Sequence, residues 1–226
     1  MAKLVFDATT KRFFETGVRN GVLFVQDSTG AYGAGVAWNG LTKVTEKPDG
    51  AEEQAKYADD MKYLSLFSAE NMKLTLEAYT YPDEFAACDG MAAPETAPGV
   101  FIGQQNRTPF GLVYKTAIGN DVQGSDYAYM LHILYGAKAS PSERGYEAIN
   151  ETPDAISLSW DLTTTPVDVP NLKPTALIRI DSRTADPTAL AALIGKLYGI
   201  DGESGVGTDP SLPLPSEIIT LMKKSA

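Results

Sequence analysis

The most regular pattern in the chain is an alternation of apolar and polar residues in two segments. Residues 72–80 and residues 156–163 place apolar side chains at every second position. Side chains of a strand point alternately to the two faces of a sheet, so this pattern is typical of a half-buried strand. In the first segment Lys73, Thr75 and Glu77 share the polar face. We therefore predict two strands, each with one face toward the core.

Further segments are rich in β-branched and aromatic residues and are bounded by Gly, Pro, Asn or Asp, which favours more strands. Segment 127–135 is mostly apolar on both faces and is predicted to lie at the centre of a sheet. Asn20-Gly21 separates two strand-like runs and predicts a tight hairpin turn. The other predicted strands are 11–18, 22–25, 35–38, 41–46, 61–68, 111–118 and 176–180.

Helix signals are confined to three segments. Asp186-Pro187 and Gly199 flank an apolar stripe, with an N-cap residue, a proline at the first position and a glycine at the stop. Shorter helices are predicted over residues 82–90 and 215–222.

Residues 47–60 are polar and show no clean period, so we predict a long exposed loop, a kind of segment that usually carries function or is mobile. Its acidic residues are Glu52, Glu53, Asp59 and Asp60. Clustered carboxylates can hold a divalent cation, but the spacing of these four is not that of an EF-hand, which favours a solvated loop.

These elements predict a fold class between all-β and α+β. Short connections favour an antiparallel β-sandwich or barrel-like sheet with one flanking α-helix and a short C-terminal helix, and they argue against a doubly wound sheet. We expect the β domain to span residues 1–200, and a linker with the short helix to span 201–226.

The net charge of the chain argues against two classes of function. The 226 residues include 29 Asp and Glu against 19 Lys and Arg, a formal net charge of −10. That balance argues against a protein that grips DNA through its phosphates and against one that binds an anionic membrane surface. No apolar stretch is long enough for a transmembrane helix, and the start lacks the apolar region of a signal peptide.

Candidate catalytic side chains are few. Cys88 is the only cysteine and His132 the only histidine. One of each excludes an intramolecular disulfide and two-histidine zinc motifs. We predict that Cys88 is buried on the apolar side of the short helix, and that His132, between Leu131 and Ile133, is a packed core or interface residue. We expect no catalytic, cofactor-binding or metal site, and a protein that is not an enzyme.

Over most of its length the amino-acid sequence resembles those of the major tail proteins, or tail tube proteins, of long-tailed, siphovirus-type bacteriophages. The similarity extends over about residues 18–200. Each matching run is weak alone, and the match rests on their number and order. The runs are Trp38-Asn39-Gly40-Leu41-Thr42, residues 57–63, 77–85 and 103–107, Asp126-Tyr127, residues 132–136 and 139–143, Ser159-Trp160-Asp161, and residues 163–167.

The resemblance implies a structural subunit of the virion tail, assembled in the host cytoplasm. In that family a β-sandwich with a flanking helix forms hexameric rings, which stack into a hollow tube through which DNA passes during ejection. The implied partners are further copies of the chain, a tape measure protein, and the tail terminator and distal tail proteins. DNA would cross the lumen without specific binding, and no membrane partner or cofactor is implied.

Two site assignments follow as expectations within this family. The polar face of Lys73, Thr75 and Glu77 is a candidate lumen surface. The loop with Glu52, Glu53, Asp59 and Asp60 is a candidate contact between rings. A β-sandwich decoration or receptor-binding domain of a virion stays open as the alternative.

Overall fold

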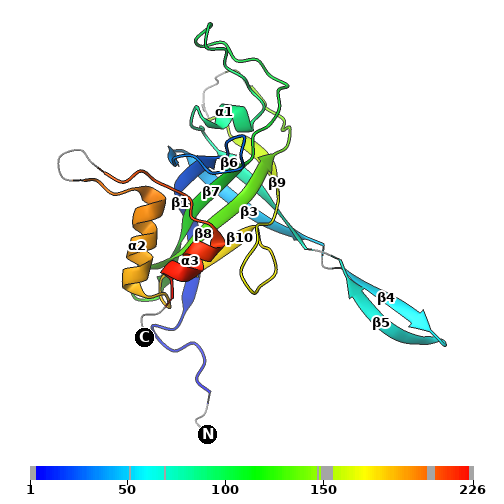
Figure 1. The fold of residues 1–226 in the computed structure, drawn as a ribbon. Coiled ribbons are helices and arrows are strands. Elements are labelled where there is room, and N and C mark those ends of the chain that lie inside the picture. The colour runs from blue at the N-terminus through cyan, green and yellow to red at the C-terminus, as the bar shows by residue number, and fades with distance from the viewer. Residues whose placement is uncertain are drawn as a thin grey trace.

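The chain forms a β-rich α+β structure that is mostly antiparallel sheet with three short helices, as the sequence predicts at this level (Figure 1). The sheet is not a closed barrel. The computed structural model describes residues 4–50, 52–68, 70–146, 148, 155–202 and 207–223.

Eight strands form one sheet, in which β2, β1, β7, β8, β9, β6 and β3 lie side by side in that order and β10 also pairs with β8. Strands β4 and β5 form a separate two-stranded hairpin. The strands are β1 (Phe13–Val25), β2 (Val36–Trp38), β3 (Leu41–Asp49), β4 (Glu53–Ala58), β5 (Met61–Phe67), β6 (Asn71–Ala78), β7 (Phe110–Asn120), β8 (Gly124–Ala139), β9 (Leu158–Thr164) and β10 (Leu177–Asp181).

Strand β8 belongs to two layers. Its residues Met130 to Leu134 pair with β10, whereas Ala137 to Ala139 pair with β9. Between these stretches lies Gly136, with a φ of +57°, a conformation that glycine adopts without a steric penalty. A β-carbon there would lie 2.4 Å from the carbonyl oxygen of Thr165. The chain therefore passes from one layer to the other at a position that only glycine fits well.

The first layer is formed by β2, β1, β7, β8 and β10, and at its centre β7 and the adjoining parts of β1 and β8 are buried on both faces. Its strands carry continuous apolar runs because neighbouring residues face different clusters: Leu112 packs toward β6 and β9, whereas Val113 packs toward the helices. Helices α2 (Pro187–Tyr198) and α3 (Pro215–Leu221) cover the outer side through Leu193, Leu197 and Ile218 (Figure 1).

The second layer, formed by β9, β6 and β3, has one buried face. Leu74, Leu76 and Ala78 of β6 and Trp160 of β9 point into the core. The residues between them point outward, so the predicted alternation is confirmed in both strands. Short helix α1 (Phe85–Cys88) closes one end of this core and lies within the predicted segment 82–90.

Helix α2 begins and ends where the sequence predicts. The Asp186 carboxylate accepts a hydrogen bond from the Ala189 N–H at 2.9 Å, Pro187 is the first helical residue, and Gly199 follows with a φ of +80°. Farther along, the described part of the C-terminal segment is docked on the first layer: Leu212 is buried there, and the Tyr135 hydroxyl donates to the Pro213 carbonyl at 2.7 Å.

The predicted hairpin at Asn20-Gly21 is wrong. Strand β1 continues through both residues and pairs with β7 on either side of two register irregularities. A type I′ hairpin turn needs a positive φ at both central residues, but only Asn20 has one, at 55°. Together with Gly17, at 69°, Asn20 marks a bulged strand rather than a reversal of the chain.

Candidate functional site

The candidate lumen residues lie side by side on the exposed face of the second layer. Glu77 forms a 3.0 Å ion pair with Lys43 of the neighbouring strand β3, and Lys73 pairs with Asp49 at 2.5 Å. The Thr75 hydroxyl donates to an oxygen of Asp161 on β9 at 2.7 Å. The three residues therefore share one face, as predicted, and each is engaged by a neighbouring strand.

Charges of both signs are mixed on this face. Lys47 lies opposite Lys73 in the pairing of β3 with β6, and Asp161 lies opposite Thr75 in the pairing with β9. With Lys43, Glu77 and Asp49, strands β3, β6 and β9 place three lysines and three carboxylates on this face, and Lys138 of β8 lies opposite Thr163 on the same side, so the face carries none of the negative net charge. A strongly acidic field over this face is therefore not what the residues provide.

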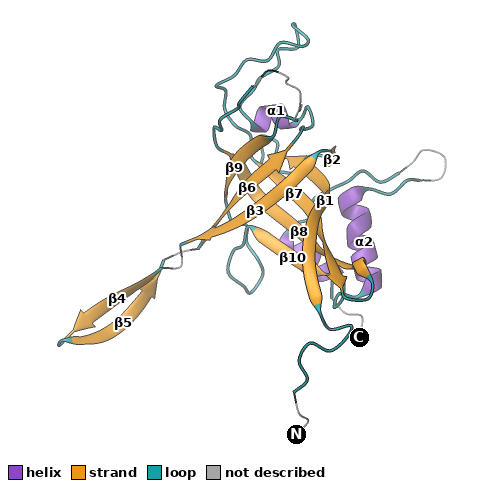
Figure 2. Ribbon diagram, turned by 180° about the vertical axis from the view of Figure 1, so that it is seen from behind, coloured by secondary structure: helices purple, strands orange, loops and turns teal. Residues whose placement is uncertain are grey.

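The segment predicted as a loop is instead strand and hairpin, and the prediction of a loop over 47–60 is wrong. Strand β3 runs to Asp49, and β4 and β5 then form a hairpin that projects from the body of the molecule (Figures 1 and 2). We call residues 53–67 the arm. Asp59 and Asp60 form its tip, with φ angles of 50° and 61°, the positive values of a type I′ turn. The predicted strand 61–68 is confirmed as β5.

The four acidic residues assigned to this segment have different positions. Glu52 flanks the base of the arm, where its N–H bonds to the Ser68 hydroxyl at 3.0 Å. Glu53 lies in β4 and accepts hydrogen bonds from Lys62 and Ser65 across the hairpin, which lower the pKa of its carboxyl. Asp59 and Asp60 occupy the tip, and neither forms an ion pair within the described parts of the chain.

Large apolar side chains lie exposed along the arm. Tyr57 is 72% exposed and Tyr63 75%, and no arm residue belongs to either core cluster. Both faces of the arm meet solvent, and no other described segment of the chain covers them. The other exposed apolar residues of the arm are Met61, Leu64, Leu66 and Phe67.

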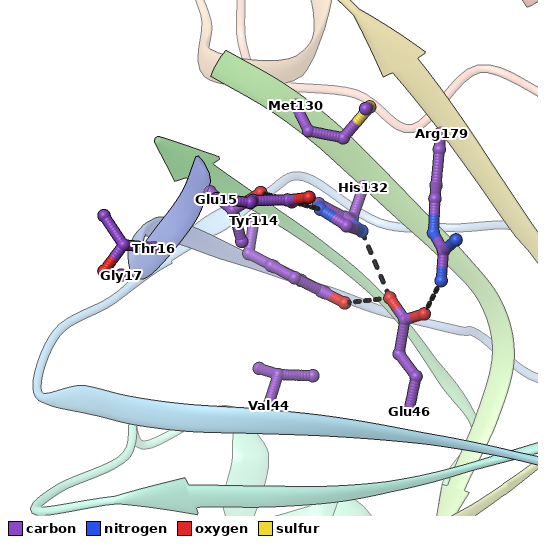
Figure 3. A pocket seen from close by; sticks show the side chains of 10 residues that line it. Glu15, Thr16, Gly17, Val44, Glu46, Tyr114, Met130, His132 and Arg179 are labelled. Carbon is purple, nitrogen blue, oxygen red and sulfur yellow. Dashed lines mark hydrogen bonds and ion pairs between the residues drawn. The ribbon is translucent and has the colours of Figure 1, made fainter. Parts of the chain in front are cut away.

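A polar cluster that the sequence did not reveal crosses the gap between the layers (Figure 3). Tyr114 of β7, His132 of β8 and Arg179 of β10 lie directly opposite one another in the strand pairing. Glu46 of β3 reaches over this row: it accepts from the Tyr114 hydroxyl at 2.8 Å, lies 3.1 Å from Nδ1 of His132, and forms an ion pair with Arg179. One carboxylate thus joins β3 to three strands of the other layer.

His132 is packed, as predicted. It is buried, its ring stacks on Tyr114 at 4.5 Å between centroids, and Nε2 lies 3.0 Å from the Thr116 hydroxyl. Burial lowers the pKa of the imidazole below its ordinary value, with Glu15 opposing the shift. Both ring nitrogens face partners in the protein, which indicates a structural role for His132. The side chain also lines a cavity of about 450 Å³.

Cys88 is fully buried, as predicted. Burial, with a smaller contribution from the neighbouring Asp89, raises the pKa of its thiol to about 12, the opposite of what a reactive cysteine needs. Among the described residues no group of three or more His, Cys, Asp or Glu side chains is placed to hold a metal ion. No helix in the described ranges is long and apolar enough to cross a membrane.

No protein-family profile matches the chain, and no curated protein matches it either.

Proposed function

We propose that the chain is a structural subunit of a bacteriophage tail tube, which self-assembles into stacked hexameric rings around a channel for DNA ejection. The observation that carries the proposal is the arm. An isolated two-stranded hairpin is marginally stable in water, and contiguous exposed apolar surface commonly marks a protein contact. An arm with six large exposed apolar residues is therefore an element that another chain covers.

The free edges of the sheet support association through the arm rather than through uncontrolled strand pairing. Strand β3 is an outer strand and carries Lys43, Lys47 and Pro48, residues that discourage edge-to-edge addition. Strand β10 is short, and at its start the N–H of Leu177 bonds to the side chain of Thr175. A subunit whose sheet edges are protected and whose arm is apolar is expected to associate with other copies through the arm.

The first test is electron microscopy of the purified full-length chain at increasing concentration. We expect hollow tubes or stacked rings. A variant in which a Gly-Ser linker replaces residues 53–67 should remain a folded monomer, because no arm residue contributes to the core. A matched control carries Lys11→Glu, an exposed change outside the arm. Tubes formed equally well without the arm would contradict the role given to it, and a stable monomer or trimer that binds sugars would favour a decoration or receptor-binding domain.

The exposed face of β6 is proposed to line the channel. Replacing Glu77 and Asp161 by lysine leaves this face with an excess of positive charge, which should bind DNA phosphates instead of letting them slide. We expect tubes of normal shape and slow or blocked DNA ejection, measured in virions that carry the variant. Glu217→Lys, on helix α3 of the opposite layer, is the matched control. Normal ejection with the lysine variant would remove this face from the lumen.

A further inference from the structure

A groove lies at the base of the arm. Its volume is about 1150 Å³. The base of the arm and the start of β6 form one wall, and Pro166, residues 173–177 and Arg179 form the other. Apolar lining residues include Phe67, Met72, Pro174 and Leu177. The volume lies at the upper end of the roughly 300–1,000 Å³ of small-molecule pockets, so the groove is large enough to receive a segment of polypeptide.

The arm cannot fill the groove of its own subunit. Phe67, at its base, is itself part of the lining, and the tip lies at the far end of the projecting hairpin (Figure 2). Six strand residues, at about 3.4 Å each, place the tip roughly 20 Å from the base. A groove and an arm on one chain are therefore separate surfaces, and each is free for another molecule.

We propose that the groove receives the arm tip of a second copy of the chain. This inference rests on the proposed function and names the surface through which the subunits meet. Because arm and groove are different surfaces, the contact is head-to-tail, and contacts of this kind close into rings or continue into open stacks. No second type of protein is needed to cover the arm.

Side-chain chemistry supports this occupant. The apolar residues near the tip, among them Tyr57 and Met61, match the apolar lining of the groove. The tip itself is acidic through Asp59 and Asp60. Lys173, which forms no ion pair with another described residue, lies on the groove wall. Arg179 also lines the groove, but its guanidinium group is paired with Glu46. Glu70 is the one carboxylate among the described lining residues, so Lys173 is the cation there that is left to meet a carboxylate of the tip.

The test is chemical cross-linking between two full-length variants. One carries Ala58→Cys, next to the tip, and the other carries Lys173→Cys, and the two are mixed under assembly conditions with a short bis-maleimide. The native Cys88 is buried and does not compete. We expect a cross-link between the two variants, because each tip lies in the groove of the next copy. Pairing Ala58→Cys with Lys11→Cys is the control and should give none.

The outcomes separate this inference from the proposed function. Tubes in the microscope with no specific 58–173 product would overturn the groove as the docking surface while leaving the tube function intact. The 58–173 product in closed dimers or trimers, without tubes, would support the groove and count against the tube. Absence of both would contradict both proposals. A tip neutralised as Asp59→Asn with Asp60→Gly keeps a favoured hairpin turn, so a weaker cross-link there would assign the lost part of the binding to charge and the remaining part to apolar contact.

Discussion

Replacing Asp89 by alanine should lower the free energy of unfolding by about 3 kcal/mol, because it breaks a buried ion cluster and leaves two guanidinium groups without their anion. The Asp89 side chain is only 7% exposed. It lies 3.1 Å from Arg107 on one oxygen and accepts from Arg144 on the other. Both arginines are about one-fifth exposed and regain some hydration, which places the effect at the lower end of the range for a broken buried pair.

Asp89 has this effect because it holds three segments together. It follows directly after helix α1. Arg107 lies in the connection to β7 and also faces the carbonyl oxygens of Ala139 and Ser140 at 3.4 Å, and Arg144 lies over the ring of Tyr81. The segments that carry Asp89, Arg107 and Arg144 lie outside the strands and lack the backbone hydrogen bonds of a sheet. The Asp89 carboxylate therefore holds them in place instead.

The measurement is urea unfolding of the arm-less variant, which avoids assembly, followed by tryptophan fluorescence. Asp89→Asn keeps the shape and one acceptor, so it should cost roughly half as much as alanine. Glu77→Ala breaks the exposed pair with Lys43 and should cost less than about 1 kcal/mol. Equal losses for Asp89→Ala and Glu77→Ala would show that the Asp89 cluster behaves as an ordinary surface pair.

The sequence predicts an element correctly where one-sided burial produces a periodic pattern of apolar residues. In β6 one face is buried, so Leu74 and Leu76 alternate with polar residues and the strand can be read directly. In α2 the cap residues Asp186 and Gly199 mark both ends. By contrast, both faces of the arm meet solvent, and β4 therefore has no apolar alternation to find, although its turn residues do have the positive φ of a hairpin.

The cluster around Glu46 was invisible for a different reason. Tyr114, His132 and Arg179 come from three strands, and they meet only because the strand register places them in one row. One sequence does not contain that register. A hint did exist, since Glu46 has the same strand phase as Val44 and thus points to the inside of the sheet rather than to solvent. A carboxylate at a core-facing position needs partners, and such a break in the pattern is worth following.

Glu46→Ala is expected to lower the free energy of unfolding by about 2–4 kcal/mol. The Glu46 side chain is 16% exposed, and its loss leaves the buried Tyr114 hydroxyl and Nδ1 of His132 without their partner, at about 1–3 kcal/mol for each unsatisfied group. Arg179 contributes less, because its side chain is half exposed and recovers water.

A double-mutant cycle decides whether the buried or the exposed partners dominate. Tyr114→Phe removes only the hydroxyl and should cost about 1 kcal/mol on its own. In the Glu46→Ala background it should instead regain part of the lost stability, because it removes a buried hydroxyl that no longer has an acceptor. Arg179→Ala alone should cost less than Tyr114→Phe. If Arg179→Ala reproduced the whole loss seen with Glu46→Ala, the carboxylate would act as half of a surface pair and not as a link between layers.

The same carboxylate connects fold stability to assembly. Glu46 lies near the end of β3, the strand that leads to the arm, and it is bound to β7, β8 and β10 of the other layer. Removing it frees that end of β3 and so lets the base of the arm and the groove beside it move relative to the first layer. We therefore expect Glu46→Ala to raise the concentration at which the full-length chain assembles, measured by sedimentation at a temperature where the variant remains folded. Tyr114→Phe leaves the Arg179 and His132 contacts in place, so it should raise this assembly concentration less. An unchanged assembly concentration in Glu46→Ala would show that the arm is positioned without the Glu46 contacts.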